Sequence, residues 1–238
     1  MTGTFLNIAT VLVGGTLGLL LGSRLPERIR QTVVTGLGLF TAAIGFKLFI
    51  GTQNGIIVLV SLLFGGVLGE WAQIEAGLAR FGEWLQSRFA RDAEGGSVRF
   101  VRGFLTASLV FCIGPLTILG SIQDGLSGDY QLLAIKSILD GFASMVFAST
   151  LGIGVLFSTL VILIYQGVLT LLAGQAQALF SDAMINELSA TGGVLLIGIA
   201  ISSLLEIKPI RVGNFLPALI FAPLIVYLLS LLGFSLAA

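Results

Sequence analysis

Charged residues are absent from long stretches of the chain, and these stretches are the clearest structural signal in the sequence. They cover 1–23, 31–46, 48–69, 103–123, 141–181, 188–205 and 212–238. A transmembrane helix needs about 20 mostly apolar residues, so most stretches have room for one helix. As a single helix at ~1.5 Å per residue, the stretch 141–181 would be about 60 Å long. That is about twice the hydrocarbon thickness, so we expect a turn at Leu151-Gly152-Ile153-Gly154.

The pattern therefore predicts an all-α, polytopic membrane helical bundle with about eight spans in a single domain, 1–238. The spans are 4–22, 32–50, 54–72, 103–121, 132–151, 154–173, 190–206 and 213–234. Composition supports this prediction, because 56% of the residues are hydrophobic and only 10% are charged. A typical globular domain is about 25% charged, so a soluble chain of this composition would lack a polar surface.

The basic residues predict the orientation, since Lys and Arg concentrate in short cytoplasmic loops. Ten of the twelve Lys and Arg residues lie in the loops after the first, third and seventh spans. The opposite side holds two basic and four acidic residues: Lys47, Lys136, Asp124, Asp129, Asp182 and Glu187. We therefore expect both termini to face the exterior or periplasm.

The segment 73–99 is the only sizeable piece predicted outside the spans. Ile74, Leu78 and Phe81 recur at helical spacing, with Glu75 and Arg80 on the other face. This pattern is typical of an amphipathic helix on the cytoplasmic membrane surface. A solvated linker packed on neighbouring loops is the alternative.

The residue inventory excludes several classes of function. The chain has no histidine, one cysteine (Cys112) and a formal net charge of zero. It therefore has no imidazole for metal or proton-relay chemistry, no internal disulfide and no basic face for nucleic acid. A nucleotide-binding loop, a zinc motif and a serine-hydrolase elbow are also absent from the sequence. We expect no enzyme and no cofactor. The expected partners are the lipid bilayer and a small solute or ion.

Glycine is abundant, at 32 residues, and much of it follows helical spacing. Gly14, Gly18 and Gly22 repeat every four residues, as do Gly65 and Gly69, which predicts close helix packing. The same faces could join two copies of the chain as a homo-oligomer. The segment 7–45 also resembles 159–198, and 102–107 resembles 140–145. These resemblances predict inverted repeats of the kind found in many secondary transporters, although glycine-rich segments also look alike by chance.

Asp140 is the first candidate for a functional residue, because an ionisable group inside a membrane is expensive and is a functional candidate by default. Lys136 lies one helical turn earlier and could pair with it. The alternative is that the pair only caps the exterior end of the helix. The span 103–121 has a polar centre around Pro115, which would kink the helix and free a carbonyl near Phe111.

These features predict a substrate- or ion-binding site near the kink, around the broken helices at 103–151. We expect five polar residues to meet there at one water-accessible cavity: Asn7, Ser121, Asp124, Asp140 and Gln166. Gln123 and Lys136 are further candidates. Each of these residues could instead only form a hydrogen bond between two helices.

Four sequence runs resemble domain-of-unknown-function family 554, the YqgA/YdfK-type bacterial inner-membrane proteins. They are FCIGP (111–115), GSIQDGL (120–126), KSILDGF (136–142) and YQG (165–167). The resemblance extends over essentially the whole chain and implies a bacterial inner-membrane protein with a transport role. It implies no particular substrate.

A weaker likeness concerns one half of the chain. Asp140 through Ser144, Gln166, and 193–199 are similar to a half-unit of MntP-type manganese exporters and other LysE-like transporters. The likeness implies that Asp140 is an ion-site residue. Arg102 stands where the second half-unit would carry its Asp, which argues against a symmetric divalent-cation site.

We therefore predict a secondary transporter or exporter of a small solute or ion, with alternating access around the broken helices. The alternative is a membrane scaffold or partner subunit that transports nothing and uses its glycine faces and the segment 73–99 for assembly.

Overall fold

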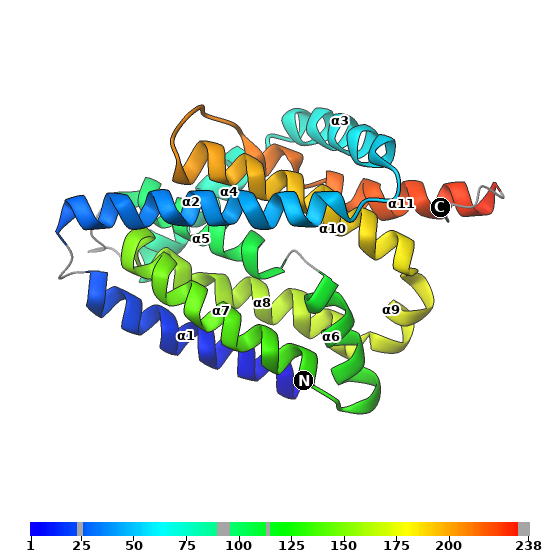
Figure 1. Ribbon diagram of the computed structural model, residues 1–238, viewed down its shortest axis with the longest axis horizontal. Coiled ribbons are helices and arrows are strands. Elements are labelled where there is room, and N and C mark those ends of the chain that lie inside the picture. Colours follow the sequence, from blue (N-terminus) through cyan, green and yellow to red (C-terminus); the bar gives the residue numbers. More distant parts are fainter. Residues whose placement is uncertain (23–25, 90–95, 113–114, 233–238) are drawn as a thin grey trace.

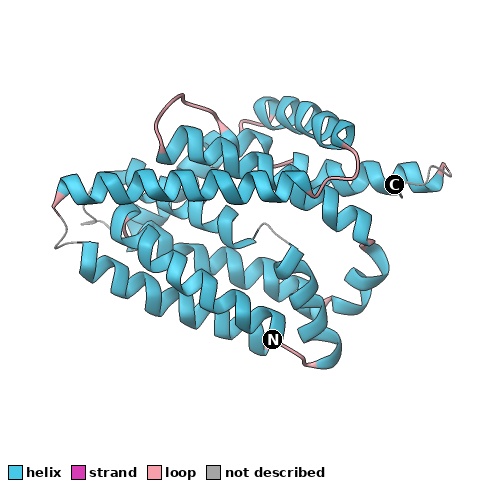
Figure 2. Ribbon diagram, in the orientation of Figure 1, coloured by secondary structure: helices cyan, strands magenta, loops and turns pink. Residues whose placement is uncertain are grey.

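The computed structural model describes residues 1–22, 26–89, 96–112 and 115–232. All regular structure in these ranges is helical (Figures 1 and 2). The helices are α1 (Thr2–Gly22), α2 (Glu27–Ile50), α3 (Gly55–Trp71), α4 (Ile74–Phe89), α5 (Gly96–Cys112), α6 (Pro115–Ser127), α7 (Gln131–Leu151), α8 (Gly154–Leu171), α9 (Ala173–Leu179), α10 (Asp182–Ile199) and α11 (Ala218–Leu231). A π-helical turn, η1 (Ala200–Leu204), extends α10, and a 3-10 turn, η2 (Val212–Phe215), precedes α11.

The predicted membrane helical bundle is confirmed. Six helices are long and apolar enough to cross a membrane, and the number rises to eight if each of two bent helix pairs forms one span. The bent pairs are α3 with the start of α4, at 61°, and α5 with α6, at 62°. Counted in this way, the eight spans follow the predicted order. The predicted turn is also found, because α7 ends at Leu151 and α8 begins at Gly154.

Several predicted boundaries were wrong. The seventh span was expected at 190–206, but α10 already begins at Asp182, where the Ser181 side chain accepts a hydrogen bond from the Met184 N–H. The eighth span was expected at 213–234, and its start agrees with the candidate span Val212–Leu231, which begins with the 3-10 turn η2; its predicted end at 234 lies outside the described residues. The short helix α9 was not predicted. The segment 73–99 contains α4 and the start of α5, and 90–95 are not described.

The helices form two groups, visible as lower and upper layers in Figure 1. The lower group contains α1, α6, α7 and α8, with α5 packed on α8. The upper group contains α2, α3, α10 and α11. The helices pack more extensively within each group than between the groups, which meet where α7 approaches α2 and where α10 approaches α5 and α6. Helix α4 also links them, because it contacts α5 of the lower group and α3 and η2 of the upper group.

Glycine allows the closest helix approaches, as its spacing predicts. Gly14, Gly18 and Gly22 of α1 lie against the backbone of α7 at Gly141, Met145 and Ser149, with no room for a Cβ atom. Gly65 and Gly69 of α3 likewise lie against Ala218 and Asn214. Among the described glycines, every such backbone contact between helices joins two members of the same group. The glycines therefore hold each group together, and they leave the boundary between the groups more loosely packed.

Helices α2 and α10 cross at a reciprocal glycine contact. A Cβ on Gly45 would lie 2.5 Å from the Gly193 carbonyl oxygen, and a Cβ on Gly193 would lie 2.5 Å from the Gly45 carbonyl oxygen. Gly38 contacts Leu205, so the two helices run antiparallel. Both belong to the segments 7–45 and 159–198, whose similarity predicts an inverted repeat. An antiparallel, reciprocal crossing is what such a repeat would produce, but the repeat stays a prediction.

Three arginines bind near the ends of helices. Arg102 pairs with Glu206, Arg211 pairs with Glu70, and the Arg99 guanidinium donates to the Thr150 carbonyl near the end of α7. In Figure 1 the N-terminus lies below the middle of the molecule, and the last described part of α11 lies at its right-hand end. Arg24 and Arg91 lie outside the described residues.

Candidate functional site

Asp140 lies near the middle of α7. It is the tenth of the 21 residues of this helix, about 14 Å from the helix start at ~1.5 Å per residue. Only 7% of its surface is exposed. If α7 crosses a hydrocarbon layer about 30 Å thick, the carboxylate sits near the midplane. The alternative that Asp140 only caps the exterior end of the helix does not agree with this position.

Two side chains hold the carboxylate. The Lys136 ammonium, one helical turn earlier, forms a buried ion pair with Asp140 Oδ2, as the spacing predicts. Asn7 Nδ2 of α1 donates a 3.0 Å hydrogen bond to the same oxygen. Asn7 can approach because α1 runs parallel to α7 and its glycines lie against the α7 backbone. Lys136, Asp140 and Asn7 are here called the charged centre.

The break between α5 and α6 lies beside this centre. Proline cannot donate a backbone hydrogen bond, so Pro115 leaves the carbonyl four residues earlier without its helical partner. That carbonyl belongs to Phe111, and the Thr117 hydroxyl donates to it over 3.3 Å. The carbonyl that the sequence predicts to be freed near Phe111 therefore has a side-chain partner. Cys112, the last residue of α5, lies within electrostatic range of both Lys136 and Asp140.

Gln166 of α8 faces the same region. The Thr4 and Thr170 hydroxyl oxygens are 3.5 Å apart, and Gly15 contacts Leu156, so α1 and α8 run antiparallel. Asn7 lies nearly one turn beyond Thr4, and Gln166 lies one turn before Thr170. Residues at these spacings share a helix face, so Asn7 and Gln166 lie on the sides of α1 and α8 that pack together.

Several buried polar atoms of the candidate residues have no hydrogen-bond partner among the described residues. Asn7 Oδ1, both side-chain polar atoms of Gln166, and Ser121 Oγ are all in this state. The side chains of Asn7, Gln166 and Ser121 are fully buried. An unsatisfied buried polar group costs about 1–3 kcal/mol. The region therefore offers unused donors and acceptors beside a desolvated ion pair.

The five residues predicted to meet do not all share one site. Asp124 lies elsewhere, accepting a 3.0 Å hydrogen bond from the Gly3 N–H and pairing with the Met1 amine over 3.0 Å. Gln123, a further candidate, donates to Asp129 in the loop after α6. The predicted access to water is also absent from this conformation, because none of the five is more than 7% exposed.

Glu187 is a buried acid that sequence reasoning placed in an exterior loop. It lies inside α10 and is fully buried. Its carboxylate accepts hydrogen bonds from the Thr52 hydroxyl at 2.6 Å and from the N–H groups of Gln53 at 2.7 Å and Asn54 at 3.1 Å. The helix-capping Ser181 followed by Asp182 is the sequence signal that would have extended α10 around it. Its bonds indicate a structural role that fixes the loop between α2 and α3.

Metal binding finds no support in the described ranges. No group of three His, Cys, Asp or Glu side chains comes together there as a metal site. The charged centre combines one acid, one base and neutral amides. That set suits a proton, a small polar solute or a small ion better than a divalent cation, which favours several carboxylate or carbonyl oxygens.

Comparison with known proteins gives the family. Residues 2–227 match the family described as "Protein of unknown function (DUF554)". The chain is 34% identical over 221 residues to "Uncharacterized protein YqgA" of Escherichia coli (strain K12), covering 92% of this chain and 94% of that protein. It is 30% identical over 237 residues to "Uncharacterized membrane protein YdfK" of Bacillus subtilis (strain 168), covering 98% and 99%. No solved structure matches it significantly. The chain therefore belongs to the DUF554 family, as its sequence motifs predict.

Proposed function

We propose that this protein is a secondary transporter of a small solute or ion in the bacterial inner membrane. Substrate or coupling ion would bind at the charged centre, which would open to one side of the membrane at a time. The observation that carries the proposal is the buried Lys136–Asp140 pair in the middle of α7, and the buried, unpartnered amide of Gln166 on α8 supports it.

A bundle that only needed to pack would gain little from this pair. Insertion of one charged residue at the centre of a membrane helix costs roughly 2.5–3.5 kcal/mol on insertion scales. Replacing a buried ion pair by apolar side chains of similar volume is often neutral or stabilising. The pair and its unpartnered neighbours are therefore better explained by a binding role than by stability.

The arrangement of helices supports a route for movement. Each helix group is held together by glycine contacts, and such contacts do not join the two groups in the described parts. Two such groups can rock against each other, which is how many transporters alternate access. The break between α5 and α6 lies beside the charged centre, so a shift of α6 would change what surrounds Asp140.

The pair also offers a way to couple transport to protons. When Asp140 gains a proton, the attraction that holds Lys136 is lost and the net charge of the centre rises by one. Asn7, which donates to the carboxylate, is neutral, and the titratable group of Cys112 lies within electrostatic range of both charges. Proton uptake would therefore change the affinity of the centre for a charged or polar solute.

We also propose that both termini face the exterior or periplasm. The basic residues in the loops after the first, third and seventh predicted spans support this orientation, because cytoplasmic loops carry an excess of Lys and Arg. Alkaline phosphatase fused after Leu232 should be active, and the same enzyme inserted after Lys208 should be inactive. The reverse pattern would refute the orientation.

The test of transport begins with a search for the substrate. The purified protein is screened for thermal stabilisation by metal ions, amino acids and small anions. Solutes that stabilise it are then measured for uptake into proteoliposomes, with and without a pH gradient. We expect Asp140→Asn to abolish uptake, and Asp182→Asn, an exposed acid at the start of α10, to leave it unchanged.

The double variant Lys136→Met/Asp140→Asn guards against simple misfolding. It removes both charges, so it should fold better than either single variant and should still fail to transport. Uptake by a folded double variant would contradict a role for the pair. If no stabilising solute is taken up by the wild-type protein, the scaffold hypothesis is favoured. The scaffold would then need other contacts, because Gly14, Gly18, Gly22, Gly65 and Gly69 are occupied within the chain.

A further inference from the structure

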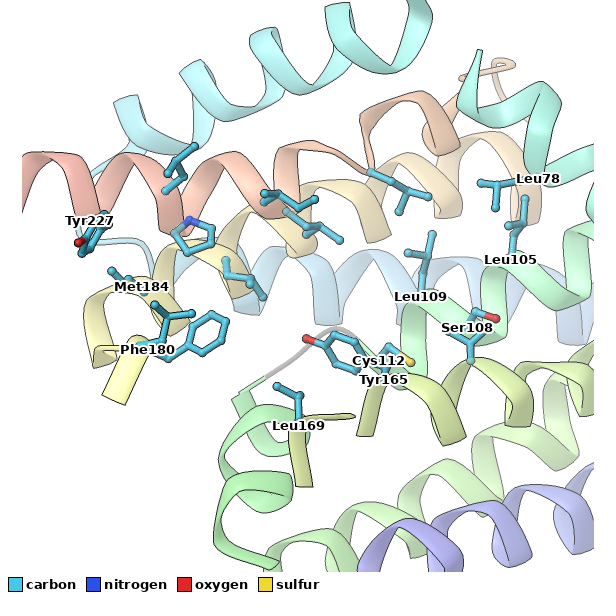
Figure 3. Close-up of a pocket in the computed structure, with 18 of the residues that line it drawn as sticks. Leu78, Leu105, Ser108, Leu109, Cys112, Tyr165, Leu169, Phe180, Met184 and Tyr227 are labelled. Carbon is cyan, nitrogen blue, oxygen red and sulfur yellow. The ribbon is translucent and has the colours of Figure 1, made fainter. Parts of the chain in front are cut away.

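A large apolar groove separates the two helix groups on one side of the molecule (Figure 3). Its volume is about 690 Å³. Helices α5 and α8 line it from the lower group, α10 and α11 from the upper group, and Leu78 of α4 and the end of α9 close it at its two ends. It contains none of the residues of the charged centre, although Cys112 belongs to its wall.

The walls of the groove are helix faces with a regular apolar pattern. On α5 the lining includes Leu105, Leu109 and Cys112, and on α11 it runs from Leu216 to Tyr227 at spacings of three and four residues. These spacings place the side chains on one face of each helix. No lining residue is charged, and the polar groups are the side chains of Ser108, Cys112, Tyr165 and Tyr227.

The volume and lining favour hydrocarbon over water as the occupant. Pockets that hold small molecules are about 300–1,000 Å³ in volume, so the groove has room for a substantial apolar group. Even a cavity of about 150 Å³ stays dry and takes up apolar guests when its walls are apolar. The groove is more than four times that size, and its few polar side chains are too sparse to hold a water cluster.

The dimensions point to a particular kind of hydrocarbon. From Leu216, two residues before α11, to Tyr227 within it, the lining covers eleven residue steps, or about 16 Å at ~1.5 Å per residue. One leaflet occupies half of a hydrocarbon layer about 30 Å thick, which is nearly the same length. Ile220, Leu224 and Tyr227 on the rim are 71%, 43% and 45% exposed. The mouth therefore opens sideways from helices that would cross the membrane, where lipid tails are the surrounding solvent.

We infer that this groove is a binding site for one acyl chain of a membrane lipid, which enters sideways from the bilayer between α5/α8 and α10/α11. The bound acyl chain would fill the boundary between the two helix groups and hold the groups apart on this side of the protein. The site follows from the shape and chemistry of the groove, so it does not depend on whether the protein transports a solute.

Quenching of tryptophan fluorescence by lipids brominated on their acyl chains tests this site. The two native tryptophans, Trp71 and Trp84, are first replaced by phenylalanine. One tryptophan is then introduced at Tyr165 in the groove, at Ile164 on the exposed face of α8, or at Phe111 in the protein core. Ile164 is 67% exposed and Phe111 is fully buried. The proteins are reconstituted in vesicles of brominated or ordinary phosphatidylcholine, and size-exclusion chromatography checks that each is folded.

We expect brominated lipid to quench Tyr165→Trp nearly as strongly as Ile164→Trp, and Phe111→Trp very little. Adding Ser108→Leu, which fills part of the groove, should reduce quenching at position 165 and leave it unchanged at 164.

Three results would overturn the inference. Quenching at 165 by aqueous iodide and not by brominated lipid would mean that the groove holds water. No quenching by either agent would mean that protein, such as a second copy of the chain, covers it. Quenching insensitive to Ser108→Leu would place the lipid outside the groove.

Discussion

Among the side chains that the structure describes, three carboxylates are buried, and their partners differ in kind. Glu187 receives two backbone N–H groups and a hydroxyl, and Asp124 receives the Gly3 N–H and the Met1 amine. Both therefore hold chain segments in place. Asp140 is held by the side chains of Lys136 and Asn7, and unpartnered amide atoms lie nearby. Side-chain partners can reorient without moving a helix. Asp140 is therefore the acid best placed to exchange partners during a functional cycle.

A double-mutant cycle on Lys136 and Asp140 tests how strongly the pair is coupled. Removing one member leaves an uncompensated charge in the bundle, which typically costs about 3–5 kcal/mol. Lys136→Met and Asp140→Asn should therefore each lower the free energy of unfolding by about this amount. The double variant should lose much less than the sum of the two. Unfolding in mixed micelles of detergent and denaturant measures the effect.

Lys47→Met serves as the control, because Lys47 is exposed near the end of α2. Its effect should be close to zero. Additive losses in the cycle, with the double variant as unstable as the sum, would mean that Lys136 and Asp140 do not stabilise one another. The ion pair would then be an incidental contact.

At the scale of the helices, small residues determine which elements meet. Where a glycine faces the backbone of a neighbouring helix, a Cβ atom would overlap that backbone, and no rotamer change could relieve the overlap. The Gly18 position on α1, against Met145 of α7, is one example. A Cβ atom added to Gly36 of α2 would meet no neighbouring atom within 4 Å, so this glycine contributes only its low helix propensity.

These two positions make a matched pair of substitutions. Gly18→Ala should lower the free energy of unfolding by about 1–3 kcal/mol, since overpacking a tight contact costs about that amount. Gly36→Ala should raise it by up to about 1 kcal/mol, because alanine favours a helix more than glycine does. Unfolding curves of the two variants in the same detergent mixture give both values. Equal effects at the two positions would contradict the proposed packing of α1 on α7.

The sequence predicts the helices well because charges are rare inside spans, and the same rule explains where the prediction fails. Glu187 was taken to mark an exterior loop, but three hydrogen-bond donors stabilise its carboxylate inside α10. The Lys136–Asp140 pair was predictable because its partners are four residues apart on one helix. The contact of Asp124 with Gly3 was not, because it joins residues far apart in the chain and depends on how α1 meets α6.

At the scale of the whole molecule, two helix groups share a loosely packed boundary. The apolar groove lies within this boundary, and Cys112 of its wall lies within electrostatic range of Lys136 and Asp140 in the charged centre. A relative movement of the groups would change the width of the groove and the cover over the centre together. In this conformation the centre is closed, since Asn7, Asp140 and Gln166 are all buried.

Alternating access requires that this closed centre open to each side of the membrane in turn. Labelling of a cysteine at Gln166 is the sharpest test of this requirement, because the Gln166 side chain has no partner to lose among the described residues. In a Cys112→Ala background, Gln166→Cys is exposed to a small, charged, membrane-impermeant thiol reagent in right-side-out and in inverted vesicles. Ile162→Cys, one turn away and equally buried, is the control. We expect slow labelling of position 166 from both sides and none at 162. If position 166 stays unlabelled in right-side-out or in inverted vesicles until the protein is unfolded, the centre does not open to that side of the membrane. Alternating access is then wrong.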